Sequence, residues 1–195
     1  MEQQQQGEIN IALIHHPVLG RNNETIGSAV TNLDIHDIAR TAKTYGIHNY
    51  YIVTPYNDQQ QLVGEIIDHW QNGHGSTYNP ARREAFELVR MAGSLEEVVE
   101  SIRQRRGQDP ALVTTSAFDQ EKTLSYSNSR KRMATGESTL LIFGTAHGLA
   151  SEVVAKADYT LPAIIGRTGY NHLSVRAAVA IICDRLFGES IDQEE

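Results

Sequence analysis

Two glycines bracket a short loop that follows the most apolar run of the chain. Residues 138–144 (STLLIFG) lead into Thr145, Ala146, His147 and Gly148. Glycine lets the backbone approach a ligand closely and adopt a positive φ. The loop lacks the Gly-Lys-Ser/Thr ending of a phosphate loop, and it is not a GxGxxG dinucleotide loop. By itself the pattern fits either a loop that contacts a ligand or a plain tight turn.

A second segment that could take part in binding or catalysis spans residues 161–174 (LPAIIGRTGYNHLS). It is apolar, contains a proline and two glycines, and stands before an apolar stretch with helical spacing. Free N–H groups at a helix start, next to apolar walls, suit a flat heterocycle that is held by backbone groups. A buried connection with polar caps is the alternative. Thr114, Thr115 and Ser116 follow another apolar run and either line the same cleft or form a turn.

Histidines and aspartates near the start of the chain raise a metal site as a rival interpretation. His15 and His16 are adjacent, and His36 stands beside Asp37. Adjacent residues on a helix point apart, and no histidine pair there has the i, i+4 spacing of shared ligands. The spacing therefore argues against a metal-dependent hydrolase, and we expect no metal.

Strand and helix patterns alternate between these loops, which predicts an α/β fold with a mostly parallel sheet and helices on both faces. Thr31, Asn32 and Asp34 are the possible N-caps of the first helix. Ser94 is the expected N-cap of the helix 94–106, and Glu97 is expected to complete a capping box. The last helix is apolar nearly all round, so we expect it to be covered on most sides. The predicted strands are 9–16, 49–55, 85–92, 111–117, 138–144 and 158–164, the predicted helices are 31–45, 58–70, 94–106, 129–135, 149–156 and 172–187, and 20–28 and 71–83 are expected loops.

Composition limits the class of protein. The chain has 195 residues, of which 40% are apolar, and a formal net charge of -7. That is enough for one domain with a real core, and no apolar run is long enough to span a membrane. The start lacks the pattern of a secretory signal, and the single cysteine, Cys183, favours a reduced, cytoplasmic setting. We expect a domain at 9–188, with disordered tails at 1–8 and 189–195.

Three motifs in order resemble the SPOUT superfamily of S-adenosylmethionine-dependent RNA methyltransferases. The stretch 39–46 (ARTAKTYG) is similar to the family's Arg-Thr-x-x-x-x-Gly motif. Residues 140–149 (LLIFGTAHGL) resemble its knot strand and glycine loop, and 161–178 resembles the pattern that closes the knot. The resemblance spans residues 9–187. The chain is also similar to a small bacterial SPOUT family of predicted RNA methyltransferases, sometimes fused behind a tRNA guanine methyltransferase.

The resemblance implies a deep C-terminal trefoil knot, a homodimer through the knot region and last helix, and an RNA substrate, either tRNA or rRNA. It implies S-adenosylmethionine as cofactor, held largely by main-chain groups, with added hydroxyl contacts from Thr145 or Ser174. The expected cofactor-binding residues are Thr114, Gly144, Thr145, His147, Gly148, Leu161, Ile164, Ile165, Gly166, Tyr170, Leu173 and Ser174.

Candidates for the reacting side are Arg40, Asn171 and His172. A guanidinium binds phosphate well and is a poor base, whereas an imidazole exchanges protons near neutral pH. The chain departs from ribose 2′-O-methyltransferases in having Asp34 and His172 where they have Asn. It also lacks the glutamate of their glycine loop and has Tyr170 in place of a serine. These differences leave the methylated atom open.

Basic residues outside the motifs suggest where RNA binds. Asn79, Arg82 and Arg83 follow a His-Gly-Ser stretch and are the expected RNA-contacting arm. Further basic clusters at 103–106 and 130–132 either meet phosphates or are ordinary solvated side chains. A non-catalytic protein that binds a nucleotide or RNA through the same fold is the alternative function.

Overall fold

A six-stranded sheet forms the centre of the molecule. The computed structural model describes residues 7–118, 120 and 122–189. The strand order is β5-β4-β1-β7-β6-β8, and neighbouring strands are parallel. The predicted α/β class is therefore confirmed. The strands of this sheet are β1 (Ile9–Ile14), β4 (Asn49–Val53), β5 (Val89–Ala92), β6 (Ala111–Thr114), β7 (Thr139–Gly144) and β8 (Tyr159–Thr160).

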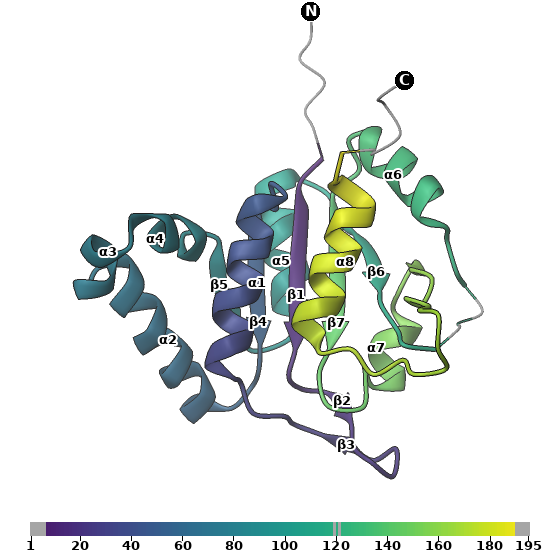
Figure 1. Ribbon diagram of the computed structural model, residues 1–195, viewed down its shortest axis with the longest axis horizontal. Helices are drawn as coiled ribbons and strands as arrows, with labels where there is room; N and C mark the ends of the chain where they lie inside the picture. Colours follow the sequence, from purple (N-terminus) through teal and green to yellow (C-terminus); the bar gives the residue numbers. More distant parts are fainter. Residues whose placement is uncertain (1–6, 119, 121, 190–195) are drawn as a thin grey trace, which may run out of the picture.

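Helices cover both faces of the sheet (Figure 1). Successive residues of a strand point to opposite faces. Ile11 and Leu13 of β1 accordingly belong to a core under α1 and α8, whereas Ala12 and Ile14 belong to one under α5 and α7. The helices are α1 (Asn32–Thr44), α2 (Asn57–Gln71), α3 (His74–Tyr78), α4 (Pro80–Phe86), α5 (Leu95–Arg106), α6 (Tyr126–Ala134), α7 (Ser151–Ala155) and α8 (Val175–Phe187).

Four predicted segments differ from the structure. The strand predicted at 85–92 is confined to Val89–Ala92, because Ala85 and Phe86 belong to α4. The expected loop 20–28 forms part of a hairpin with strands β2 (Val18–Leu19) and β3 (Thr25–Ile26). The expected loop 71–83 contains α3 and most of α4, because the Asn79 side chain caps Arg82 N and Pro80 occupies the first turn. The strand predicted at 158–164 is confined to Tyr159–Thr160, after which the chain leaves the sheet.

Helix ends follow the predicted caps. Thr31 accepts a hydrogen bond from Asp34 N, and Ser94 accepts one from Glu97 N. The Glu97 carboxylate accepts from Gly93 N and not from the cap residue, so the box closes one residue earlier than predicted. These caps fix where α1 and α5 begin.

The last helix packs against β7, α1 and α6, and Asp184 is its only exposed residue, so it is covered on most sides as predicted. The buried residues of α8 include Val179, Ile182 and Leu186. Ala178 and Ile181 remain half-exposed. A largely apolar helix with half-exposed side chains is typical of a surface that another molecule covers.

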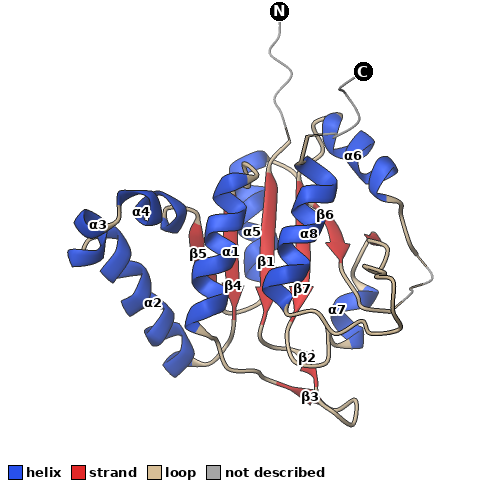
Figure 2. Cartoon of the chain, viewed as in Figure 1, coloured by secondary structure: helices blue, strands red, loops and turns tan. Residues whose placement is uncertain are grey.

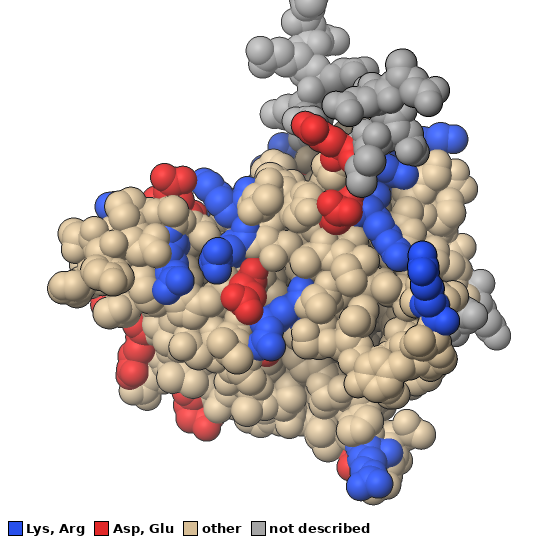
Figure 3. Space-filling model, viewed as in Figure 1, with Lys and Arg blue, Asp and Glu red and all other residues tan. Residues whose placement is uncertain are grey.

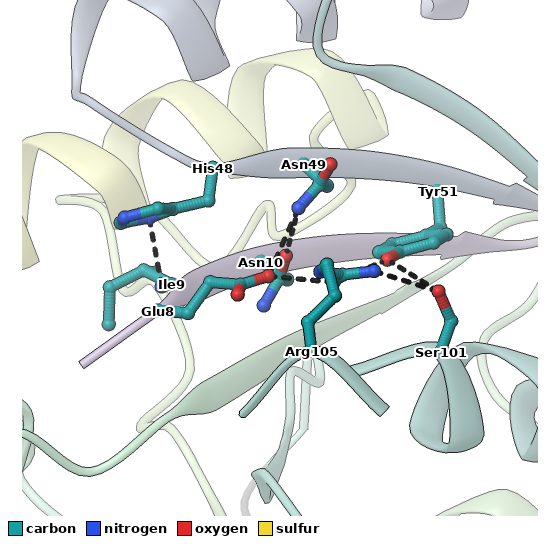
Figure 4. Close-up of polar contacts among 8 residues, drawn as sticks. All are labelled: Glu8, Ile9, Asn10, His48, Asn49, Tyr51, Ser101 and Arg105. Carbon is teal, nitrogen blue, oxygen red and sulfur yellow. Dashed lines mark hydrogen bonds and ion pairs between the residues drawn. The ribbon is translucent and has the colours of Figure 1, made fainter. Parts of the chain in front are cut away.

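A polar network closes the amino edge of the sheet (Figure 4). Arg105 Nη2 donates to Glu8 Oε1 at 2.7 Å and to the Tyr51 hydroxyl at 2.8 Å. Asn49 Nδ2 reaches both Glu8 Oε1 and Asn10 Oδ1. Burial raises the pKa of Glu8, but the hydrogen bond and charge of Arg105 outweigh it and hold that pKa below 4.5.

The expected tails lie mostly outside the described residues, which exclude 1–6 and 190–195. Glu8 falls inside the expected tail 1–8, but its side chain is buried and ion-paired with Arg105. The ordered domain therefore begins before Ile9.

Candidate functional site

Three loops leave the sheet at the carboxyl ends of neighbouring strands (Figure 2). Thr114 of β6 is paired with Ile142 of β7 on one side and with Thr160 of β8 on the other. The segments after these strands are 145–150, 115–118 and 161–174. Ligands of open α/β sheets bind at this edge, so the structure brings the two glycine-containing segments of the sequence to the same edge.

The glycine loop folds tightly back on itself. A Cβ at Gly144 would lie 2.8 Å from Leu149 N and 3.0 Å from Gly148 C, closer than backbone permits. Gly148 has φ of 116° and Ala146 has φ of 51°. The two glycines are thus required by the path of the loop itself, and a Cβ at Gly148 would otherwise face open space.

The β2–β3 hairpin holds this loop from outside. Leu19 N donates to Gly148 O at 2.9 Å, and His147 N donates to Leu19 O at 3.1 Å. Only the main chain of His147 takes part, and its side chain is exposed. The hairpin therefore belongs to the site, although the sequence indicated only a Gly/Asn-rich loop there.

The hydroxyl of Thr145 is engaged inside the protein. Its Oγ1 donates to Ile14 O at 3.0 Å and is hydrogen-bonded to Ser28 Oγ. Ser28 Oγ in turn lies 3.0 Å from His15 Nδ1. If Thr145 contacts the cofactor through its hydroxyl, as predicted, the same oxygen must also keep its hydrogen bond to Ser28. Neither His15 nor Ser28 was predicted in this role. The available signal for His15 was its place near the end of the predicted strand 9–16, which in the structure ends at Ile14.

Thr114 is also engaged internally. Its Oγ1 lies 2.8 Å from Thr160 Oγ1, and both residues are buried. Thr115 Oγ1 donates to Ile142 O. These hydroxyls tie β6 to its two neighbours, so they shape the carboxyl edge and do not face into it as free donors.

The segment 161–174 changes from buried to exposed along its length. Leu161 N donates to Thr114 O, continuing the ladder, and the Leu161 side chain is buried. Ile164 is half-buried. Beyond it Ile165 is 74% exposed, Tyr170 72% and Leu173 45%. A Cβ at Gly166 would meet no atom within 4 Å, so the main chain there borders open space.

The expected reacting residues Asn171 and His172 lie on this exposed part. Asn171 Nδ2 donates to Ala117 O at 2.5 Å, which ties the segment to the loop after β6. The His172 ring stands edge-on to Tyr170, with centroids 5.4 Å apart. Ser174 is the N-cap of α8 and accepts from Ala177 N, so the helix starts later than predicted.

Arg40 stands apart from these loops, on the exposed surface of α1. Within the part of the chain that the structure describes it forms no ion pair. Asp37, a potential partner, is bound by Arg176 of α8, whose Nε lies 3.5 Å from Asp37 Oδ2. Arg176 Nη1 also contacts Asp34 Oδ1 at 3.3 Å. Asp34 and Asp37 therefore join α1 to α8 and leave Arg40 unpaired among the described residues.

The expected RNA arm forms a side lobe beyond β5, made of α2, α3 and α4 (Figure 1). The Arg82 guanidinium stacks 4.6 Å from the centre of the Trp70 ring. Asn79 is occupied as the cap of α4. Arg83 is exposed. Burial and the charge of Arg82 lower the pKa of His36, which packs against Trp70.

Ion pairs neutralise part of the other basic clusters. Arg103 pairs with Asp109 at 2.6 Å, and Arg132 pairs with Glu137 at 2.7 Å. A hollow of about 400 Å³ near Arg132 lies at the amino end of β6, away from the three loops. Surface ion pairs of this kind are the ordinary solvated arrangement.

The described residues contain no group of three or more His, Cys, Asp or Glu placed to hold a metal ion. None of their helices has the length and apolar character needed to cross a membrane.

Comparisons with known proteins agree with this architecture. A family model described as SAM-dependent RNA methyltransferase matches residues 8–188. A tRNA (guanine-N(1)-)-methyltransferase of Oleidesulfovibrio alaskensis is 44% identical over 92% of this chain. The chain spans only 42% of that relative's length. An Aquifex aeolicus protein of unassigned function is 41% identical, with 92% of this chain and 88% of the relative covered.

Solved structures share the fold at lower identity. The SpoU methyltransferase AviRb from Streptomyces viridochromogenes, solved with the cofactor AdoMet, has a TM-score of 0.56 at 17% identity. The match covers 93% of this chain and 60% of AviRb. TrmJ from Z. mobilis has a TM-score of 0.59 at 15% identity, covering 94% and 69% of the two chains.

Proposed function

Because the chain belongs to the family of SAM-dependent RNA methyltransferases, we propose that it methylates tRNA at the carboxyl edge of its sheet. The name of the Oleidesulfovibrio alaskensis relative supports tRNA over rRNA. One observation supports this location of the active site: three adjacent strands are followed, at one edge of the sheet, by the segments 145–150, 115–118 and 161–174. The family match replaces the metal-dependent hydrolase considered at the outset.

The residues at this edge fit S-adenosylmethionine. Leu161 and Ala163 are buried and Ile164 is half-buried, which supplies apolar walls for a purine. The main chain at Gly148 and Gly166 borders open space, where no added Cβ would meet an atom. Backbone N–H and C=O groups bounded by apolar side chains are typical of a small-molecule site. Gly144, Ile165, Tyr170 and Leu173 are proposed to complete it.

The bound cofactor supplies a methyl group on a positively charged sulfur, which makes that carbon electrophilic. With the cofactor bound, an oxygen or nitrogen of the RNA would bond to this carbon, and the sulfur would leave with the electrons of the carbon–sulfur bond. The protein must align these atoms and receive the acceptor's proton. We assign proton transfer to His172, because its ring is exposed beside Tyr170 on the same segment. Asn171 holds that segment against Ala117.

Phosphate contacts are assigned to Arg40 and to Arg83 of α4. Both are exposed, and neither has an ion-pair partner among the described residues. The stack of Arg82 on Trp70 holds α4 in position. If Arg83 contacts phosphate, Arg83→Ala weakens RNA binding and lowers its salt dependence with cofactor affinity kept. Arg130→Ala, an exposed arginine of α6 on the other side of the molecule, is the control (Figure 1).

A homodimer through the last helix and the neighbouring loops fits the exposed surfaces. Figure 3 shows that few charged side chains lie over the lower part of this face, where the loops of the carboxyl edge run. Ile165, Tyr170 and Leu173 are exposed there. Sedimentation of Ile165→Glu against wild type tests the dimer, because a charge in a buried interface separates the copies.

The decisive experiment is transfer of labelled methyl from S-adenosylmethionine to purified tRNA and rRNA from a strain that lacks the gene. Mass analysis of the nucleosides then identifies the modified base or ribose. Label in tRNA is the expected result. Binding of S-adenosylmethionine without transfer to either RNA would instead support the non-catalytic alternative, and absence of binding would overturn the proposal.

A further inference from the structure

A chain of three side chains links the central strand to the glycine loop. His15 follows β1 and is 0% exposed. Its Nδ1 lies 3.0 Å from Ser28 Oγ, and Ser28 Oγ is hydrogen-bonded to Thr145 Oγ1. Thr145 Oγ1 also lies 3.0 Å from Ile14 O. The three residues come from the ends of β1, the β2–β3 hairpin and β7, so the chain joins segments far apart in the sequence.

The direction of these hydrogen bonds follows from the number of hydrogens. A carbonyl oxygen only accepts, so the Thr145 hydroxyl donates to Ile14 O and must accept from Ser28. The Ser28 hydroxyl has then used its one hydrogen, and it accepts from His15 Nδ1–H. The competing contact of Ser28 Oγ with His15 O is longer, at 3.5 Å. His15 is thereby a donor at Nδ1, while its Nε2 is buried and has no hydrogen-bond partner within the described residues.

The loop that receives this chain needs support. Ala146 is in a left-handed conformation, at φ of 51°, which costs energy for a residue with a side chain. The hairpin secures the far end of the loop through Leu19, His147 and Gly148. The near end is secured by the Thr145 hydroxyl alone among side chains of the described residues.

We propose that His15 is a positioning residue of the glycine loop, acting through Ser28 to fix Thr145 and so the direction of the main chain at 145–148. It contacts neither substrate nor cofactor in this role. The proposal rests on the proposed function for the identity of the ligand, because the same loop borders the assigned S-adenosylmethionine site.

Two amide variants separate the nitrogens of the ring. The amide nitrogen of asparagine takes the place of Nδ1, so His15→Asn keeps a donor for Ser28. The amide of glutamine takes the place of Nε2, so His15→Gln loses that donor. His16→Gln is the control, because His16 is the next residue and packs against Tyr56 outside the chain of hydrogen bonds.

The first readout needs no ligand. Hydrogen exchange of the His147 amide, which is bonded to Leu19 O, reports opening of the loop. We expect exchange about tenfold faster in His15→Gln and close to wild type in His15→Asn and His16→Gln, the size expected for one lost buried hydrogen bond. Unchanged exchange in His15→Gln, or equal acceleration in both His15 variants, would overturn the proposal.

The second readout is calorimetric titration with S-adenosylmethionine. We expect about tenfold weaker binding in His15→Gln and near wild-type binding in His15→Asn, at similar thermal stability. Equally weaker binding of S-adenosylmethionine in the two variants would mean that His15 only fills the core, and would overturn the positioning role. If wild type does not bind S-adenosylmethionine, the proposed function fails, while the exchange measurement still decides the role of His15.

Discussion

Arg176 Nη1 lies 3.3 Å from Asp34 Oδ1, which ties the first turn of α8 to the first turn of α1. The same guanidinium reaches Asp37. The Asp34 side chain is mostly buried and also accepts a hydrogen bond from the Thr31 hydroxyl at 2.6 Å. The link fixes the start of the last helix, and thus the end of segment 161–174, relative to the rest of the sheet.

Removing the charge at Arg176 is expected to destabilise the protein. Arg176→Met keeps most of the side-chain length but leaves the Asp34 carboxylate without its cation, so we expect a loss of about 1–3 kcal/mol in the free energy of unfolding. Urea unfolding measures it. Lys43→Met is the control, because the Lys43–Glu84 pair is exposed and 3.9 Å long. Equal stability of Arg176→Met and wild type would show that the pair contributes nothing.

Alanine at Gly144 should destabilise the protein, whereas alanine at Gly166 should leave its stability unchanged. In Gly144→Ala the new Cβ meets Leu149 N at 2.8 Å, so we expect a loss of about 1–3 kcal/mol and weaker S-adenosylmethionine binding. In Gly166→Ala the Cβ meets nothing within 4 Å, and stability should hold. Thermal unfolding and calorimetry measure the two properties. A stable Gly144→Ala would contradict the tight turn.

Stability should fall as the solution is acidified through pH 6.5. Burial lowers the pKa of His15 below 6.5, although the Asp34 carboxylate and nearby carbonyls oppose the shift. The unfolded chain then binds its proton at higher pH than the folded chain, so stability is lost as pH falls from 6.5 toward the folded pKa. His36 acts in the same direction.

Urea unfolding at a series of pH values checks this effect. Below pH 6.5 the stability of His15→Asn should decline less steeply than that of wild type, because one buried titrating group is gone. Above that pH the two curves should run parallel. Equal slopes on the acid side would show that His15 titrates alike in the folded and unfolded chains.

The single cysteine should be inert until the protein unfolds. Cys183 of α8 is 0% exposed, and burial raises the pKa of its thiol to about 12. Because the thiolate is the reactive form, we expect no modification by a thiol reagent in the native protein and rapid modification in denaturant. Rapid labelling of the native protein would mean that α8 detaches readily from the core.

Much of the sheet could be predicted from the sequence because its strands are short apolar runs with clear ends. Thr31 and Ser94 were among the predicted N-caps, because the side chain of an N-cap residue bonds to backbone within the same turn. The lobe containing α3 and α4 was missed because its short polar helices lack apolar periodicity. Of the predicted strand 158–164, only Tyr159 and Thr160 lie in the sheet, because the next residues turn away toward α8.

The site was only partly predictable. The two glycine-containing segments both follow strands, as expected, and leave the sheet at its carboxyl edge, whereas the internal hydrogen bonds of the hydroxyl groups were not predicted. Thr114 and Thr145 bond to Thr160 and Ser28, partners that are distant in sequence and become visible only in three dimensions. The deep trefoil knot stays a prediction.

The position of β1 in the sheet has a consequence for synthesis on the ribosome. β1 lies between β4 and β7, and β7 begins only at Thr139. As the chain emerges, β1, β4 and β5 can assemble first. The side of β1 that pairs with β7 stays unpaired until residues 139–144 have been synthesised. Until then an apolar strand edge, Ile9–Ile14, is open to wrong partners. The hydrogen bonds that join Ser28 to the glycine loop can therefore form only after β7 and Thr145 have been synthesised.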